Sequence, residues 1–291
     1  MEMPCCQPIA VNHLRISITQ VCNMNCFYCH HEGQETSNRE MSLEVIRSIA
    51  YDIGQLGIQY VKITGGEPLL RKDILQIVQA FSSIPTIREI SMTTNGLLLK
   101  PLAMDLKKAG LSRVNIGCDT ILSPVLSKKF EQILPGIQSA NQAGLHPIKL
   151  NMVLLKGIND REIPEMIRYA KEYGFILQLI ELIPNGDPDL DRYFLPIKPI
   201  EDELAKQAEH ITIRDLQSRR QYTIQGAVVE AVGPSKQDFC EKCLKIRITS
   251  DGFVKPCLRR NNNLIPYTGI DSIKQAISLK RRYEHGHDEH C

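Results

Sequence analysis

Short apolar runs and amphipathic segments alternate along the first two thirds of the chain. The β-rich apolar runs cover residues 14–19, 59–64, 87–92, 113–117, 147–154 and 176–182. Between them, apolar residues recur at helical spacing over residues 42–57, 71–81, 101–109, 128–143 and 162–173. Repeated strand–helix units are typical of parallel strands covered by helices, so the pattern predicts an α/β fold. A partial barrel and an open doubly wound sheet both fit it.

The pattern changes after residue 185. Residues 185–191 have the composition of a turn-rich connector, residues 200–210 predict one amphipathic helix, and residues 211–232 predict short strands interrupted by Gly226. We therefore expect two domains, residues 1–195 and residues 196–291.

Composition narrows the class of protein. The 291 residues are 43% hydrophobic and 23% charged, with a formal net charge of +2. This balance favours neither nucleic acid nor an anionic membrane as a partner. No apolar run approaches the roughly 18 residues that a membrane span needs, and no secretory signal precedes the first strand. We expect a cytoplasmic protein.

Six of the ten cysteines fall into two groups, and this spacing favours metal ligation over disulfides. The first group is Cys22, Cys26 and Cys29, in a loop after the first predicted strand. Thiolates suit zinc or iron–sulfur clusters, and three of them leave one iron of a four-iron cluster open. A zinc site completed by His30 or His31, or three separate buried thiols, are the alternatives. The cysteines outside both groups are Cys5, Cys6, Cys118 and Cys291.

The loop from Cys22 to Cys29, with Tyr28 before the last cysteine, resembles the signature of the radical S-adenosylmethionine (SAM) superfamily. The Gly65-Gly66 pair after the second strand strengthens the resemblance, because glycines let a backbone approach a ligand closely. The resemblance implies a partial (β/α)6 barrel in which the three cysteines hold a 4Fe-4S cluster and SAM chelates its open iron. The SAM contacts that it implies are Tyr28, Gly66, Glu67 and Gly117.

Similarity to one subgroup, the GTP 3′,8-cyclases of molybdenum cofactor biosynthesis, extends over most of the chain. It is carried by residues 14–19, 62–73, 93–96, 149–151 and 156–159. A triphosphate needs arginines and lysines to bind it. The GTP contacts implied by the resemblance are Arg15, Lys62, Thr93, Lys149, Lys245, Ile246 and Arg247, with Arg15 and Arg247 as the catalytic pair. On the residues alone, several of these could be solvated strand ends.

The second cysteine group is Cys240, Cys243 and Cys257. Residues 250–252 predict a hairpin turn that brings Cys257 back beside the other two. A zinc ribbon with one ligand missing is the alternative. The resemblance implies a second 4Fe-4S cluster that binds the substrate purine, facing the first across the mouth of the barrel.

The resemblance also implies a reaction. A 5′-deoxyadenosyl radical, formed from SAM, takes hydrogen from C3′ of GTP; the C3′ radical then attacks C8, and uptake of an electron and a proton gives 3′,8-cyclo-7,8-dihydro-GTP. An electron donor protein is required, which the sequence does not identify. The oligomeric state stays open, with a homodimer as one option.

Four positions depart from the cyclase pattern. Lys245 and Gln178 stand where arginine is usual, Gly117 stands for a serine that contacts SAM, and residues 285–291 replace a double-glycine tail. The alternatives are therefore a radical SAM paralogue that modifies another nucleotide or a peptide, and a scaffold protein that binds structural zinc.

Overall fold

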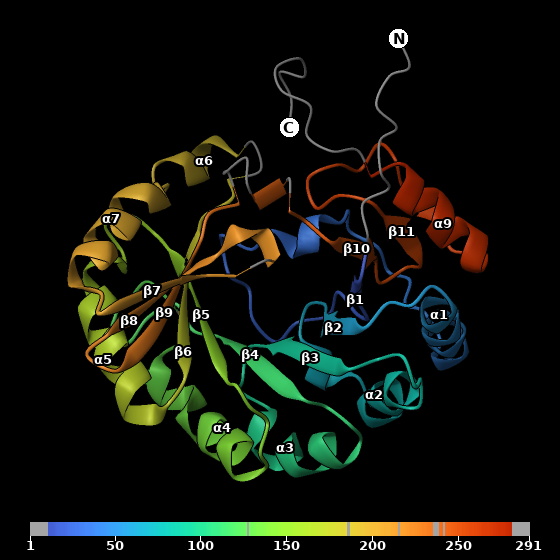
Figure 1. Ribbon diagram of the computed structural model, residues 1–291, viewed down its shortest axis with the longest axis horizontal. Coiled ribbons are helices and arrows are strands. Elements are labelled where there is room, and N and C mark those ends of the chain that lie inside the picture. Colours follow the sequence, from blue (N-terminus) through green and yellow to red (C-terminus); the bar gives the residue numbers. More distant parts are fainter. Residues whose placement is uncertain are drawn as a thin grey trace.

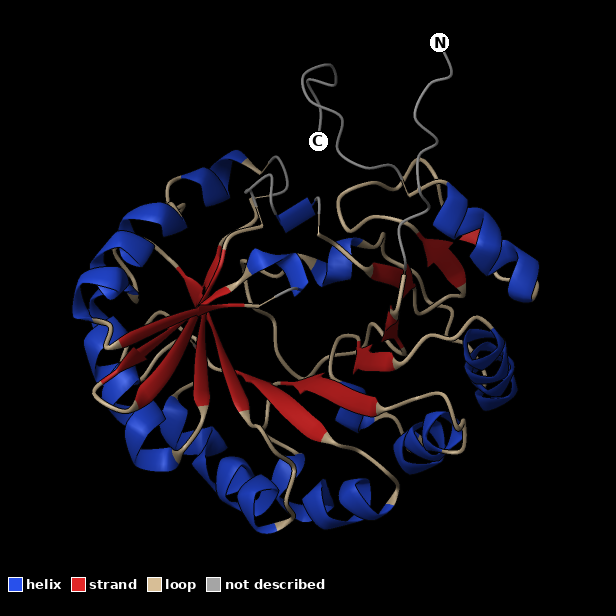
Figure 2. Ribbon diagram, viewed as in Figure 1, coloured by secondary structure: helices blue, strands red, loops and turns tan. Residues whose placement is uncertain are grey.

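The computed structural model describes residues 11–280 except residues 127, 185–186, 215, 235–238 and 241. One twelve-stranded sheet curves around the interior of the molecule, and helices cover its outer face (Figure 1). Figure 2 shows this division, with strands inside and most helices outside. The strand order is β12-β11-β10-β1-β2-β3-β4-β5-β6-β9-β8-β7.

Eight neighbouring strands of the sheet are parallel. They are β1 (His13–Ser17), β2 (Tyr60–Thr64), β3 (Glu89–Thr94), β4 (Arg113–Gly117), β5 (Lys149–Leu154), β6 (Ile176–Glu181), β9 (Ala227–Val232) and β10 (Lys245–Ile248). Antiparallel strands extend each edge. These are β7 (His210–Ile213) and β8 (Arg220–Ile224) at one edge, and β11 (Phe253–Lys255) and β12 (Ile265–Pro266) at the other.

The helices connect the strands as the sequence pattern predicts. The longer ones are α1 (Leu43–Gln55), α2 (Ile74–Ser82), α3 (Leu99–Lys108), α4 (Phe130–Gln142), α5 (Ile163–Tyr173), α7 (Ile197–Gln207) and α9 (Ile270–Ser278). The short helical segments are α6 (Pro188–Asp191), η1 (His31–Gly33), η2 (Pro68–Leu70), η3 (Asp160–Glu162) and η4 (Leu216–Ser218). No helix in these parts of the chain is long and apolar enough to cross a membrane.

The predicted α/β class is confirmed, and the first six strands lie within a few residues of their predicted bounds. The sheet does not end at residue 196, however. Strand β9 pairs with β6 and β10 pairs with β1, so the C-terminal part extends the same sheet at both edges. The division into two domains thus remains a prediction about the chain, and it does not correspond to a break in the sheet.

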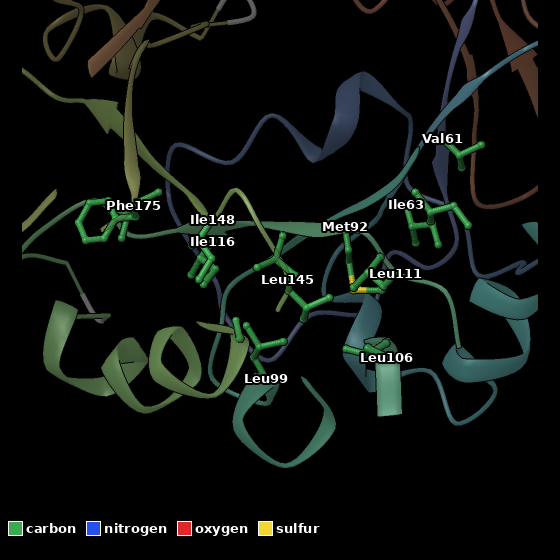
Figure 3. Close-up of a cluster of buried hydrophobic side chains, with 14 of the residues drawn as sticks. Val61, Ile63, Met92, Leu99, Leu106, Leu111, Ile116, Leu145, Ile148 and Phe175 are labelled. Atoms are coloured by element: carbon green, nitrogen blue, oxygen red, sulfur yellow. The ribbon is translucent and has the colours of Figure 1, made fainter. Parts of the chain in front are cut away.

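The two faces of the sheet have opposite character. Outward side chains such as Ile63, Met92 and Ile116 pack with Leu106 and Leu145 in the buried layer between strands and helices (Figure 3). Because strand residues alternate between faces, the residues between these apolar ones point to the concave face. That face carries polar and charged residues, and it is where the predicted substrate contacts lie.

Candidate functional site

The Gly-Gly loop after β2 fixes the chain that leads into the first cysteine group. The amide of Gly66 donates to the Thr19 carbonyl at 2.8 Å, and the amide of Glu67 donates to the Val21 carbonyl at 2.8 Å. A Cβ on Gly66 would lie 2.3 Å from the Val21 oxygen. Only glycine fits there, because the two backbones touch directly.

Cys22, Cys26 and Cys29 are free thiols that lie close enough to influence one another. Burial and the charge of neighbouring cysteines both raise the pKa of Cys29. Within the described residues, no three His, Cys, Asp or Glu side chains have the arrangement of a metal-ion site. The adjacent His30 has a buried Nδ1 without a hydrogen-bond partner there. Three reduced, partly accessible sulfurs fit a cluster with an open corner, and their ligand role remains a proposal.

A cavity opens beside this group. Tyr28 donates from its hydroxyl to Asp119 Oδ2 at 2.6 Å, and the Val153 amide donates to Asp119 Oδ1 at 2.6 Å. The residues that line it are Met24, Asn25, Cys26, Phe27, Tyr28, Asp119, Val125, Leu126 and Lys128. The cavity is therefore open to a ligand that also reaches the cysteines.

Two further predicted SAM residues border this region. The Glu67 carboxylate accepts from the Thr94 hydroxyl at 2.7 Å and from the Asn95 amide at 2.6 Å. The Glu67 side chain thus fixes the C-terminal end of β3. Burial raises the pKa of Glu67. At Gly117, an added Cβ would lie 3.4 Å from Lys128 Nζ, which donates to the Gly117 carbonyl. Lys128 thus lies beside Gly117, the position at which the cyclase pattern has serine.

Strand register brings the predicted substrate contacts together on the concave face. Arg15 is opposite Lys62 on one side and Arg247 on the other, and Asn115 is opposite Lys149. Thr93 and Lys245 join the same face from β3 and β10. By alternation Ile246 points to the opposite face and is fully buried, so its side chain lies in the apolar layer.

This face holds more positive charge than its acids neutralise. Burial, followed by the charges of Arg113, Arg15, Lys245 and Lys149, lowers the pKa of Lys62 well below its ordinary value. A bound anion would relieve this repulsion between cations, so the arrangement suits an anion-binding site.

Two buried carboxylates partly balance these cations. Glu32, in η1, accepts from Arg15 Nε at 2.6 Å and from the Thr64 hydroxyl at 2.9 Å, and Arg247 Nη1 lies 3.8 Å away. Burial opposes ionisation of Glu32, but the charges of Arg15, His30 and Arg247 and the hydrogen bond from Arg15 together outweigh it and lower the pKa of Glu32 to about 2.

Glu230, on β9, is the second carboxylate and is completely buried. It pairs with Lys149 at 2.6 Å and with Arg214 at 3.0 Å, and it also accepts from Gln178 and Gln221. Burial opposes ionisation of Glu230, yet the charge and hydrogen bond of Lys149, with the charges of Arg219 and Arg214, together lower its pKa to about 2. The pKa of Lys149 falls to about 8, because burial outweighs the attraction of Glu230.

The second cysteine group borders the same cations. Strands β10 and β11 form the predicted hairpin, closed by a 2.9 Å bond from the Thr249 amide to the Phe253 carbonyl. Burial raises the pKa of Cys243, but the charges of Lys280 and Lys245 outweigh this and lower it, which favours a thiolate ligand. The charges of Cys243 and Cys257 act on Arg247. Arg247 Nη1 also lies 3.8 Å from Glu32, whose charge acts on Cys29, so Arg247 is linked electrostatically to both groups.

Several residues of this face could not be identified from the sequence. Glu230 had a usable signal, as the single charge in the apolar run from Ala227 to Val232. Glu32 follows Cys29 by only three positions, but nothing there indicated its pairing with Arg15. Arg113 and Arg219 had no distinguishing pattern. Cys5, Cys6, Cys291 and the tail at residues 285–291 lie outside the described residues.

Comparison with protein families gives two matches. Residues 16–170 match the radical SAM superfamily, and residues 175–285 match the family described as Molybdenum Cofactor Synthesis C. Superfamily membership supports the use of SAM and an iron–sulfur cluster.

Curated relatives cover most of the chain. A probable GTP 3′,8-cyclase of Methanosarcina mazei is 43% identical over 93% of this chain and 84% of its own length. Another, from Methanothermobacter marburgensis, is 43% identical over 91% of this chain and 88% of its own. The Pyrococcus abyssi relative, of the same name, is 41% identical over 94% and 96% respectively.

Solved structures share the fold. Streptococcus suis SuiB bound to S-adenosylmethionine has a TM-score of 0.66, covering 88% of this chain and 62% of that one at 16% identity. The anSMEcpe structure with bound AdoMet has a TM-score of 0.64, covering 92% and 80% at 17% identity. These likenesses support the radical SAM type of barrel and carry nothing about the substrate.

Proposed function

The chain belongs to the radical SAM superfamily and, within it, to the family of GTP 3′,8-cyclases, and from this we propose that it converts GTP to 3′,8-cyclo-7,8-dihydro-GTP for molybdenum or tungsten cofactor biosynthesis. The chain is a lyase-type enzyme on this account. The observation that carries the substrate assignment is the group of buried and half-buried cations that strand register brings together on the concave face.

The charge of that face matches a nucleoside triphosphate. Arg15, Lys62, Lys149, Lys245 and Arg247 all lie on it, and the acids that we find among them are Glu32 and Glu230. A ligand with several negative charges relieves the mutual repulsion of these side chains. Thr93 offers a hydroxyl on the same face. A peptide substrate gives no comparable reason for so many buried cations.

We assign the cofactors to the two cysteine groups. Cys22, Cys26 and Cys29 hold one 4Fe-4S cluster, and Cys240, Cys243 and Cys257 hold a second. When bound at the first cluster, SAM supplies the chemistry that removes the C3′ hydrogen of GTP. Tyr28 lines the cavity that we assign to SAM, and Gly117 lies beside Lys128, which also lines it.

The side chains of the protein orient the nucleotide and exclude water. Arg15 and Arg247 are the catalytic pair that the family resemblance implies; they are neighbours on β1 and β10, and the charges of Cys243 and Cys257 act on Arg247. In the structure both face Glu32, which therefore has to release them, at least in part, when the nucleotide binds. Positioning of this kind is the main contribution a protein makes to a cofactor's reaction.

The departures from the cyclase pattern have local explanations. Gln178 donates to Glu230 and accepts from Asn115, so it connects the two sides of the cation group without adding a charge. Lys245 keeps the charge of the usual arginine but loses its fork of donors. An electron donor protein, a homodimer and a cytoplasmic location remain predictions from the sequence.

The function is tested by anaerobic reconstitution with iron, sulfide, SAM, a reductant and GTP. We expect a cyclised product of unchanged elemental composition relative to GTP, identified by mass spectrometry. Formation of 5′-deoxyadenosine without that product, while another nucleotide or a peptide is modified, would show that the chain is a paralogue.

For R247A we expect loss of GTP turnover with slow, uncoupled SAM cleavage; normal turnover would remove Arg247 from the site.

A further inference from the structure

The connection between β7 and β8 reaches across the concave face. It contacts residues at and just before β10, on the side of that face opposite β7 and β8. The Gln217 amide of η4 donates to the Lys242 carbonyl at 3.3 Å. The side-chain oxygen of Gln217 accepts from Lys245 Nζ at 2.8 Å. In the sheet order, β10 is the parallel strand at one end of the parallel run and β8 follows the strand at its other end, so this connection joins opposite sides of the curved sheet.

Arg219 lies in this connection, beside a predicted substrate contact. Its Nη2 donates at 2.5 Å to the same Gln217 oxygen that accepts from Lys245. Its Nε is buried and has no hydrogen-bond partner in the described part of the chain. A buried guanidinium nitrogen without a partner is costly, which indicates that a ligand supplies the missing acceptor.

The surroundings of Arg219 are cationic. Burial, together with the charges of Arg214, Arg15 and Arg113, outweighs the attraction of Glu230 and lowers the pKa of Arg219 to about 10. Arg219 is still charged at neutral pH. Glu230 is already paired with Lys149 and Arg214, so it does not neutralise a third cation.

We propose that Arg219 is a phosphate ligand of the nucleotide, supplied from the β7–β8 connection to the same anion as Lys245. The inference rests on the proposed function for the identity of the nucleotide, but its physical basis is the polyphosphate alone. A planar guanidinium binds phosphate oxygens through two donors, and Nε is one of the pair that makes such a fork. Arg219 thus sets a preference for nucleotides with a phosphate chain over the bare nucleoside.

Binding to the cluster-loaded protein tests this by equilibrium dialysis with GTP, guanosine and inorganic tripolyphosphate. For R219Q we expect GTP and tripolyphosphate to bind about tenfold more weakly or worse, the loss of one charge-assisted bond, with guanosine unchanged. R219K should show a smaller loss for the same two ligands. The matched control is R220Q, because Arg220 is the next residue and is exposed; it should bind all three as the unchanged protein does.

Two results would overturn the proposal. One is unchanged binding of GTP and tripolyphosphate by R219Q. The other is an equal loss for GTP and guanosine, which a structural role alone would produce. If thermal melting shows that R219Q does not fold, the same binding measurements on R219K, with GTP, tripolyphosphate and guanosine, decide the question. Should the unchanged protein fail to bind GTP, the proposed function fails, while the tripolyphosphate arm still decides whether Arg219 binds phosphate.

Discussion

At the scale of single residues, Glu230 is the side chain on which most of the concave face depends. It is completely buried and accepts from Lys149, Arg214, Gln178 and Gln221, which come from three strands and a connection. A buried carboxylate is stable only when its partners are in place. Glu230 therefore positions Lys149 for the substrate without contacting the substrate itself.

Replacing Glu230 with glutamine should destabilise the protein by about 3 kcal/mol, because Lys149 then remains buried without a counter-charge. The free energy of unfolding in urea measures this. The control is E165Q, which removes an exposed partner of Arg168 and should leave stability unchanged. If the free energy of unfolding falls no more in E230Q than in E165Q, Glu230 does not stabilise the cation group.

Lys149 should make nucleotide binding depend on pH. Its pKa is about 8 in the free protein, and a bound polyphosphate raises it, so binding near pH 8 takes up about half a proton at this residue. At pH 6 Lys149 is already protonated and contributes no uptake. Calorimetry in buffers of different ionisation enthalpy measures the proton number.

K149Q should lower the uptake at pH 8 by that half proton, and K171Q, at an exposed residue of α5, should not change it. An identical proton number for K149Q and the unchanged protein would place Lys149 away from the anion.

At the scale of elements, the loop after β2 holds the first cysteine loop by direct backbone contact. Alanine at Gly66 places a Cβ 2.3 Å from the Val21 oxygen, so the chain before Cys22 has to move. We expect G66A to lose SAM binding, measured by equilibrium dialysis, and to melt at a lower temperature. In G117A the new Cβ meets a flexible lysine end at 3.4 Å, and SAM should still bind. Equal SAM binding by G66A and the unchanged protein would contradict the packing argument.

The elements also show what the sequence could and could not predict. The βα units were predictable because the outward face of each strand packs on a helix and leaves a regular apolar pattern. The hairpin at residues 250–252 was predictable from its turn residues, and β10 and β11 pair through it in the structure. The pairing of β9 with β6 and of β10 with β1 was not, because register across 50 residues or more leaves no local signal.

The same reasoning applies to the site. Local motifs revealed the cysteines, and a family resemblance supplied Arg15, Lys62 and Arg247. The acids Glu32 and Glu230 gain their roles only from long-range contacts with Arg15 and Lys149. Arg219 depends on the sheet curving far enough for η4 to reach β10.

At the scale of the whole molecule, the curved sheet brings both cysteine groups to one cationic face. The proposed two clusters should give about eight irons per chain after anaerobic reconstitution. Replacing Cys240, Cys243 and Cys257 together with alanine should leave about four, with SAM still cleaved slowly. Iron analysis and the release of 5′-deoxyadenosine measure both. A triple variant that keeps all its iron would remove the second cluster from the account.

The most direct test of the central claim uses GTP that carries deuterium at C3′, incubated anaerobically with the reconstituted enzyme, SAM and a reductant. We predict that the deuterium appears in 5′-deoxyadenosine, formed together with the 3′,8-cyclised product. If 5′-deoxyadenosine carries no deuterium and GTP is recovered unchanged, the concave face does not hold GTP for this reaction.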